Sequence, residues 1–435
     1  MAFIEESMFR EERLRALLDG RRILIAGYGR EGKSAERVLT RLLPAAPYRV
    51  ADGEEQIGVE AAKDFDLIVK SPGVPMRALP RQVRHKVTSL TDLFMQVYGD
   101  LTVGITGTKG KSTTSSLIHH LLPGSVLAGN IGIPLFDILD RLDAQSLVVA
   151  ELSCHQLEVL HRSPHVGVLL NLYQEHLDHY EGYEGYKMAK MQIGLHQHAG
   201  DRLYYCADNA ELAAMVNRLR SDMSGMLEAY SLDGMTDAEA AIVNACPLAG
   251  DHNRSNALVA LRVARALRPG TDAVLAARMA SFEGLHHRME RVGERRGIVW
   301  YDDSISTIPE ATIAAVKALG RVDTLILGGF DRGIDYEPLA RFLREHPVGR
   351  IVCVGKAGRR IKALCGGVEA QWLVEDDYSQ IVPWCAAHTP QGGTVLLSPA
   401  AASYDAFRNF EERGDCFASL VASLQAAPPA PQAGR

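Results

Sequence analysis

The chain has 435 residues, which is too long for one compact core and predicts two to four domains; we expect three. Its net charge of -6 argues against nucleic acid as the main ligand. No stretch approaches the roughly 20 apolar residues that a membrane helix needs, and the glutamate-rich first residues lack the basic start and apolar core of a signal peptide. We therefore expect a cytoplasmic protein that binds neither nucleic acid nor membrane.

The cysteines indicate a reduced compartment. There are seven, an odd number, and no two of them form a Cys-x-x-Cys pair, which argues against a disulfide framework or a zinc cage. We expect most of them to be small buried side chains. Only Cys154 lies within a motif to which we assign chemistry.

A glycine-rich turn follows the first predicted strand, residues 22–26. The turn, residues 27–32, has Gly-x-Gly-x-x-Gly spacing, and a second strand, residues 48–50, is followed closely by Asp52. A third strand, residues 66–69, leads into Ser71. The pattern is typical of a Rossmann-like domain that binds a nucleotide or a nucleotide sugar, but a turn that only packs a helix on a strand is an equally good interpretation. NAD is less expected, because no complete dinucleotide-binding architecture follows.

A second glycine-rich segment follows the apolar residues 101–103 and predicts a phosphate-binding loop. Such a loop surrounds a polyphosphate with backbone N–H groups and with the positive end of the next helix. Lys111 would then reach the terminal phosphates, and the Ser112 hydroxyl would bind Mg²⁺. The loop is a shorter variant of the common form, because Ile105 stands where the first glycine is usual. Its predicted nucleotide-binding residues are Gly107, Thr108, Lys109, Gly110, Lys111, Ser112 and Thr113.

Polar residues follow the next two predicted strands, residues 146–150 and 166–171. Glu151 directly follows the first, where a carboxylate can complete the Mg²⁺ shell that Ser112 begins, although a solvated strand-end glutamate is the simpler alternative. His176 and Asp178 follow the second and are capable of binding metal, while His179 fits a surface histidine better. Lys187 and Lys190, three residues apart on a predicted helix, have no clear role from the residues alone, since either could be an exposed charge.

A third α/β alternation begins after residue 284. Strands are predicted at residues 298–301, 324–327, 351–354 and 394–397, with helices between them. Arg288 stands at the entry to this region and could grip a phosphate oxygen with both guanidinium donors. Asp303 and Arg332 follow two of the strands, at the ends where α/β sheets place ligands. The proline-rich residues 426–435 are predicted to be disordered.

The order and spacing of these motifs resemble the Mur ligase family of ATP-dependent enzymes in peptidoglycan synthesis, most closely its glutamate-adding MurD type. The resemblance covers almost the whole chain. It implies a three-domain α/β fold: a Rossmann-like domain over residues 1–97, a central phosphate-loop domain with a mostly parallel sheet over residues 98–284, and a Rossmann-like domain over residues 285–425. The motifs that carry the resemblance include residues 71–73, 107–112, 129–132, 151–153, 175–178, 252–253, 287–288, 303–304 and 397–414.

The resemblance also implies a reaction. ATP phosphorylates the free carboxylate of UDP-N-acetylmuramoyl-L-alanine, and the amine of glutamate attacks the acyl phosphate. The resemblance assigns catalysis to Lys111, His176 and Lys190, and two Mg²⁺ ions to Ser112, Glu151, His176 and Lys190, with Lys190 carrying a carbamate. It implies a monomer, and it assigns ATP to the phosphate loop with Asn256, Arg288 and Asp303. It assigns the UDP-sugar to Gly29, Arg30, Asp52, Ser71, Asn130 and Ser153. It assigns glutamate to Thr307, Arg332, Ser403, Tyr404 and Phe410.

Two departures from the family pattern concern the choice of amino acid. Ile305 and Ile308 replace a lysine and an asparagine beside the glutamate site, and Tyr173 replaces a threonine. A related branch that adds L-glutamate also has Asp-Ser-Ile-Ser-Thr at residues 303–307, whereas residues 403–414 follow the D-glutamate pattern. We predict D-glutamate, with L-glutamate as the alternative.

Two alternative functions predict different sequence features. A folylpolyglutamate synthase would lack the Rossmann-like N-terminal region, which is present here. A non-catalytic nucleotide-sugar binding protein would have lost Lys111, Glu151 or His176, all of which remain.

Overall fold

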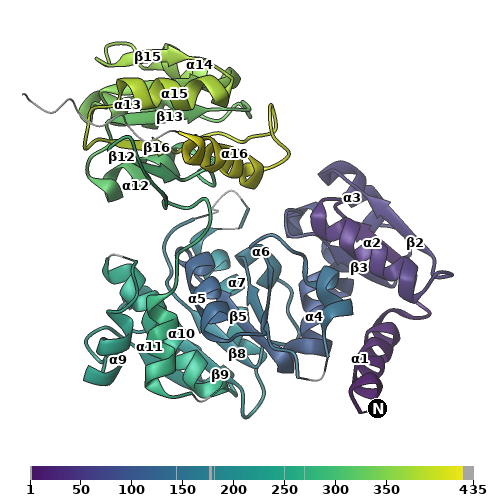
Figure 1. The fold of residues 1–435 in the computed structure, drawn as a ribbon. Coiled ribbons are helices and arrows are strands. Elements are labelled where there is room, and N and C mark those ends of the chain that lie inside the picture. Colours follow the sequence, from purple (N-terminus) through teal and green to yellow (C-terminus); the bar gives the residue numbers. More distant parts are fainter. Residues whose placement is uncertain are drawn as a thin grey trace, which may run out of the picture. The chain divides into compact units, whose positions relative to one another are not determined.

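The computed structural model describes residues 2–143, 145–175, 179–180, 182–248, 250–268 and 270–424, with side chains from residue 9 onward. The described residues form three sheets flanked by helices (Figure 1). The chain divides into two compact units, Met1–Glu283 and Gly284–Arg435. The first two sheets belong to the first unit and the third sheet belongs to the second.

The N-terminal sheet is parallel, with strand order β2-β1-β3-β4. Its central strands, β1 and β3, are apolar almost throughout and buried along their whole length, which is typical of a parallel sheet covered on both faces. The elements of this region are α1 (Ala2–Leu18), β1 (Ile23–Ala26), α2 (Arg30–Leu42), β2 (Tyr48–Ala51), α3 (Glu54–Ala61), β3 (Leu67–Lys70), β4 (Val87–Thr88) and α4 (Leu90–Tyr98).

The central sheet is also parallel, with strand order β10-β9-β8-β5-β7-β6. The chain leaves β5 toward β6 on one side and later reaches β8 on the other, so the carboxyl end of β5 is a switch point, where α/β sheets bind ligands. The elements are β5 (Thr102–Thr106), α5 (Lys111–Leu121), β6 (Val126–Gly129), β7 (Val148–Glu151), α6 (Cys154–Leu157), β8 (Val166–Leu169), α7 (Gly182–Leu195), β9 (Arg202–Cys206), α8 (Ala210–Arg218), β10 (Met226–Tyr230), α9 (Asp237–Val243), α10 (Asp251–Leu267) and α11 (Asp272–Ala280).

One hydrophobic core runs from the first sheet into the second. Helix α4 links them, and its side chains are almost all buried because they contact both regions. Its N-cap, Ser89, accepts a hydrogen bond from the Asp92 N–H. Arg10 of helix α1 donates to the Val97 carbonyl oxygen at 2.7 Å and to the Asp100 carboxylate at 2.8 Å, which holds α1 beside α4. The N-terminal and central regions are therefore packed as one body.

The third sheet has strand order β11-β12-β16-β13-β14-β15. Only the β11–β12 pair is antiparallel among the described strands of this sheet. The elements are β11 (Glu290–Arg295), β12 (Ile298–Asp302), α12 (Pro309–Leu319), β13 (Thr324–Gly328), α13 (Glu337–Glu345), β14 (Arg350–Val354), α14 (Gly355–Leu364), β15 (Gln371–Val374), α15 (Tyr378–His388), β16 (Thr394–Leu397) and α16 (Phe410–Ser423).

These observations confirm the predicted fold class, a three-sheet α/β architecture with a parallel central sheet. The exact domain boundaries stay predictions, and the segment 426–435 lies outside the described residues. Six strands were not predicted from the sequence: β4, β6, β9, β10, β11 and β15. None of the described helices is long and apolar enough to cross a bilayer.

All seven cysteines are free thiols. Cys246 of the first unit and Cys416 of the second are half-buried, and the other five are buried.

Trp300 on β12 is fully buried in the second unit and packs beside Phe417. Replacing it with alanine removes a large side chain from a closed core, so Trp300→Ala should lower the unfolding free energy of this unit by about 3–5 kcal/mol. Urea denaturation followed by far-UV circular dichroism would measure the change. Trp372→Ala is the matched control, because Trp372 is half-buried on edge strand β15 and its loss should cost less. Equal losses for both variants would contradict this account of the core.

Candidate active site

The phosphate loop, residues 107–113, joins β5 to helix α5. Gly110 is the N-cap of α5 and has a left-handed backbone with φ of 86°, which a side chain would strain. A Cβ at this position would lie 2.8 Å from the Asn256 amide oxygen. Asn256 of helix α10 therefore lies against the loop, and its assignment to ATP stays a prediction. The start of α5 directs backbone N–H groups and the positive helix end toward any anion bound there.

The loop is braced by the segment after β8. Asn171 accepts hydrogen bonds from the Thr108 N–H through its carbonyl oxygen, at 3.1 Å, and from the Lys109 N–H through its side chain, at 2.8 Å. The Thr108 hydroxyl lies 2.8 Å from the Tyr186 hydroxyl. At Gly107 a Cβ would come within 2.8 Å of the Leu170 Cβ. The loop is therefore held by contacts with a neighbouring strand end.

Two lysines, the half-buried Lys111 and the buried Lys190, share the Gly107 carbonyl oxygen. Lys111 Nζ donates to it at 3.0 Å, and Lys190 Nζ of helix α7 donates to it at 2.9 Å. Burial lowers the pKa of Lys111. Burial, with a further contribution from the charge of Lys111, lowers the pKa of Lys190 to about 7. The site thus concentrates positive charge where phosphate groups would bind, and Lys190 loses its proton readily.

Glu151, the last residue of β7, fits a metal ligand. Its side chain is 2% exposed, and one carboxylate oxygen accepts a hydrogen bond from Asn130 Nδ2 at 2.7 Å. The other oxygen is buried and has no hydrogen-bond partner among the described residues. A buried carboxylate oxygen without a partner is costly, and carboxylate oxygens are ligands that Mg²⁺ prefers. His176 and Asp178, the other predicted metal-binding residues, lie outside the described residues.

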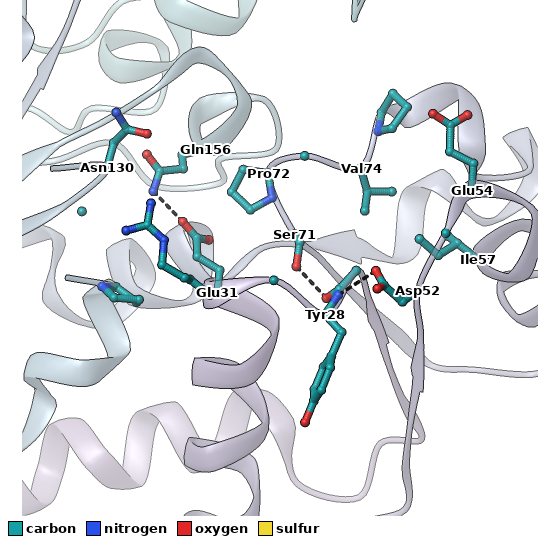
Figure 2. A pocket seen from close by; sticks show the side chains of 18 of the residues that line it. Tyr28, Glu31, Asp52, Glu54, Ile57, Ser71, Pro72, Val74, Asn130 and Gln156 are labelled. Atoms are coloured by element: carbon teal, nitrogen blue, oxygen red, sulfur yellow. Dashed lines mark hydrogen bonds between the residues drawn. The ribbon is translucent and has the colours of Figure 1, made fainter. Parts of the chain in front are cut away.

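A cavity of about 430 Å³ lies between the glycine-rich turn of the N-terminal sheet and the turn after β6 (Figure 2). The turn of residues 27–32 is tightly folded, because a Cβ at Gly32 would lie 2.1 Å from the Gly27 carbonyl oxygen. Ser71 donates its hydroxyl proton to the Gly27 carbonyl oxygen at 2.8 Å, and the Tyr28 N–H donates to Asp52 at 3.1 Å. These bonds fix the turn at the edge of the cavity, at the ends of three parallel strands.

Most of the predicted UDP-sugar residues meet in this cavity: Gly29, Arg30, Asp52, Ser71 and Asn130 all line it. Ser153 does not, and its hydroxyl instead caps helix α6 by accepting from the Gln156 N–H at 3.3 Å. Glu31 and Gln156 were not predicted from the sequence, but they also line the cavity and are joined by a hydrogen bond. Glu31 lies inside the glycine motif and Gln156 follows the Glu151 motif, so a closer reading of both motifs could have suggested them.

In the second unit, Asp303 follows β12 and is buried. It accepts hydrogen bonds from the Ser398 hydroxyl at 2.7 Å and from the Met289 N–H at 3.2 Å. Burial raises the pKa of Asp303 to about 6, although its serine partners oppose that shift. His287 is bonded to Asp302 at 2.7 Å and has a left-handed φ of 60°, and the next residue, Arg288, is exposed. The structure therefore places Arg288 and Asp303 at the start of the same unit.

The predicted glutamate residues also belong to the second unit. Arg332 donates to the Thr307 carbonyl oxygen at 2.9 Å, so these two residues are in contact. Tyr404 is largely exposed and its ring meets the Phe330 ring in an edge-to-face arrangement, while Ser403 before it is buried. Phe410 begins helix α16, and its carbonyl oxygen accepts from the Ser304 hydroxyl at 2.8 Å. The structure brings Thr307 and Arg332 together; no direct contact with Ser403, Tyr404 or Phe410 is described for either.

Comparison with known proteins places the chain in a family. It is 36% identical over 451 aligned residues to UDP-N-acetylmuramoyl-L-alanine--L-glutamate ligase of Salinispora tropica, covering 93% of this chain and 98% of that one. The chain belongs to the Mur ligase family. Residues 105–264 match the family model of the Mur ligase middle domain. The chain is thus an ATP-dependent ligase that forms amide bonds, and it uses ATP with Mg²⁺ as the family does.

Two further similarities bear on specificity and on fold. The chain is 36% identical over 382 residues to UDP-N-acetylmuramoylalanine--D-glutamate ligase of Geotalea uraniireducens, covering 82% of this chain and 83% of that one. Relatives named for both glutamate enantiomers thus resemble this Mur ligase. The crystal structure of MurF from Acinetobacter baumannii superposes with a TM-score of 0.59 at 17% identity, over 95% of this chain and 98% of that one, which shows the shared fold.

The phosphate loop gives a testable prediction. Gly110→Ala forces a side chain into a left-handed backbone, at about 1–2 kcal/mol, and pushes it against Asn256. We expect the affinity for a non-hydrolysable ATP analogue, measured by calorimetry with Mg²⁺, to fall about tenfold or more. Gly270→Ala is the control, since a Cβ there meets open space. Unchanged affinity in Gly110→Ala would show that the turn does not shape the nucleotide site.

Proposed function

We propose that this Mur ligase joins glutamate to UDP-N-acetylmuramoyl-L-alanine, with conversion of ATP to ADP and phosphate. The observation that supports it most directly is the hydrogen bond between Asn130 and Glu151. Asn130 lines the cavity proposed for the UDP-sugar, and Glu151 ends the strand beside the phosphate loop. One hydrogen bond thus separates the sugar site from the proposed metal site, so the acid of the sugar can reach the terminal phosphate of ATP.

The chemistry follows from the inertness of a carboxylate toward an amine. Transfer of the terminal phosphoryl group of ATP to the alanyl carboxylate makes an acyl phosphate, whose phosphate is a good leaving group. Lys111 would stabilise the charge that develops on the transferred group. Ser112 and Glu151 would hold Mg²⁺, which supplies positive charge to the phosphates. The amine of glutamate then attacks the carbonyl carbon, phosphate leaves, and the amine loses a proton.

The remaining assignments follow the same proposal. Asn256, Arg288 and Asp303 would bind ATP, and Arg332 would grip a glutamate carboxylate with Thr307, Ser403, Tyr404 and Phe410 alongside. Ser153 would contact the sugar through groups other than the hydroxyl lone pair it uses to cap helix α6. We further propose that the enzyme works as a monomer in the cytoplasm, where its nucleotide substrates are made.

We also propose that Lys190 carries a carbamate that binds the second metal ion with His176. Lys190 is buried with its Nζ beside another lysine, and in that position an anionic group would remove an unfavourable pair of positive charges. Carbamate formation requires the neutral amine to attack carbon dioxide. The lowered pKa of Lys190, about 7, makes that amine available near neutral pH.

This proposal predicts a pH dependence. Below its pKa Lys190 is protonated and cannot react, so its carbamylated fraction should rise as pH increases from 6 to 8 at constant carbon dioxide. A carbonyl resonance from ¹³C-labelled bicarbonate would measure that fraction by NMR. The resonance should be missing in Lys190→Arg and retained in Lys187→Arg, since Lys187 instead forms ion pairs with Glu184 and Glu211. A signal that survives in Lys190→Arg would contradict the assignment.

The identity of the glutamate enantiomer depends on two segments. The prediction of D-glutamate comes from residues 403–414, but one residue of this segment, Arg413, serves the fold. Arg413 is fully buried and donates to the Ala401, Ala402 and Ser304 carbonyl oxygens and to the Ser304 hydroxyl. Similarity at Arg413 therefore carries little information about the amino acid.

The loop after β12 supports the other enantiomer. Ile305 and Ile308 flank Ser306 and Thr307 and offer no charge or amide to an incoming carboxylate. The sequence of residues 303–307 is the one expected for ligases that add L-glutamate, and the relative from Salinispora tropica has that name. We therefore propose L-glutamate as the substrate. The sequence-based prediction of D-glutamate stays the competing hypothesis.

The decisive experiment is product analysis. The enzyme is incubated with ATP, Mg²⁺ and UDP-N-acetylmuramoyl-L-alanine, with D- or L-glutamate offered separately, and the product is identified by mass. We expect product with L-glutamate and at least a hundredfold lower rate with Lys111→Ala, which lacks the proposed phosphate-binding charge. Product with D-glutamate alone would reverse the proposed enantiomer. No product with either would remove the proposed function.

A further inference from the structure

Glu31 is an acidic residue in the part of the sugar cavity that should bind negatively charged groups. It is the second residue of helix α2, which has Gly29 as its N-cap and begins at Arg30. The N-terminal end of a helix favours the binding of phosphate groups. One Glu31 carboxylate oxygen accepts a hydrogen bond from Gln156 Nε2 at 2.6 Å (Figure 2). The other oxygen is buried and has no hydrogen-bond partner in the part of the chain that the structure describes. A carboxylate here would repel a bound diphosphate.

The neighbouring charges do not neutralise Glu31. Lys70 of β3 is buried nearby, but its ammonium donates to the Val74 carbonyl oxygen at 2.9 Å and lies 3.0 Å from Glu158. The Arg30 guanidinium donates to the Gly132 carbonyl oxygen at 3.2 Å. Asp52 and Glu54, which line the same cavity, are acidic themselves. Glu31 is thus a half-buried acid with one buried carboxylate oxygen, and among the described residues it has one neutral hydrogen-bond donor and no ion pair.

Gln156 cannot turn away to relieve this arrangement. Its side-chain oxygen accepts from the Ser153 N–H at 2.9 Å, as part of the capping box of helix α6. That bond orients the Gln156 amide group so that its NH₂ faces Glu31. The carboxyl group is therefore held in place, with its second oxygen available to a ligand in the cavity.

We propose that Glu31 takes up a proton when the diphosphate of the nucleotide sugar binds, and that the protonated carboxyl then donates a hydrogen bond to a phosphate oxygen. The inference rests on the proposed function, because that function supplies the ligand. The proton comes from solvent and returns when the ligand leaves, and no other bond is made or broken. Burial already raises the pKa of Glu31 to about 7, against the opposing effects of Gln156, Lys70 and Arg30. An anion beside it would raise that pKa further.

Linkage gives the sign of the pH effect. Above the pKa of Glu31 in the ligand-free protein, about 7, binding of each ligand molecule is coupled to the uptake of close to one proton. The affinity for the ligand should therefore fall about tenfold for each unit of pH increase. Below that pKa the group is already protonated, and the affinity should level off. The dependence should disappear when residue 31 cannot ionise.

Titration calorimetry tests the inference directly. UDP is titrated into the enzyme at pH 8 in two buffers that differ in ionisation enthalpy, and the difference in measured heat gives the protons taken up. We expect close to one proton for the wild type and for Glu54→Gln, a matched control on the same cavity, and none for Glu31→Gln. Because glutamine mimics the protonated acid, Glu31→Gln should bind UDP at pH 8 at least as tightly as wild type.

Uridine binding and product formation distinguish a failure of this inference from a failure of the proposed function. Uridine has no phosphate and should bind without proton uptake. If UDP binds with no uptake while the enzyme still makes product, this inference is wrong and the proposed function stands. If Glu31→Gln takes up as many protons as wild type, another group titrates and the inference is also wrong. If neither UDP nor UDP-N-acetylmuramoyl-L-alanine binds, the inference and the proposed function both fail.

Discussion

The hydrogen bond from Asn130 to Glu151 is the contact on which the first unit's chemistry depends. Gly129, just before Asn130, has a left-handed φ of 97°, and a Cβ there would lie 2.3 Å from the Glu151 carbonyl oxygen. The turn after β6 is thus folded closely over the end of β7. The same bond leaves one Glu151 oxygen without a partner, and places a wall of the sugar cavity beside the strand that leads into the phosphate loop. The Asn130–Glu151 hydrogen bond thus positions residues of both the proposed metal site and the sugar cavity.

That arrangement is electrostatically unfavourable in the absence of ligands. Lys190 and Glu151 are buried, and Lys111 and Glu31 are half-buried; the charged forms of groups withdrawn from water are disfavoured unless they are paired. The two lysines repel each other across one carbonyl oxygen. Such strain is typical of sites whose ligands supply the missing charges. Bound phosphates, metal ions and protons would each relieve part of it, so substrates should stabilise this unit as well as react in it.

Local motifs explain why much of the fold and part of the site were predictable. The phosphate loop and the turn of residues 27–32 are set by neighbouring residues. Parallel strands bring their ends together, so Asp52 and Ser71, which follow predicted strands, could be placed beside that turn. Asn130 follows β6, a strand that was not predicted, and only the family resemblance assigned it. The strands that were missed are less regular: β15 is a short edge strand, and β11 is half-exposed, antiparallel and bulged. The contact between Glu31 and Gln156 joins residues 125 positions apart, and no local pattern reports it. Sequence also could not separate Lys187 from Lys190, one helical turn apart, because only the fold decides which is buried.

The distribution of thiols has a practical consequence for studying motion. Of the seven cysteines, only Cys246 and Cys416 have partial access to solvent, and each belongs to a different compact unit. Burial raises the pKa of both thiols, so labelling will be slow, but it will favour these two over the five buried ones. A fluorophore pair or two spin labels on the natural chain would therefore report the separation between the units as nucleotide and amino acid are added, with no cysteine introduced and none removed.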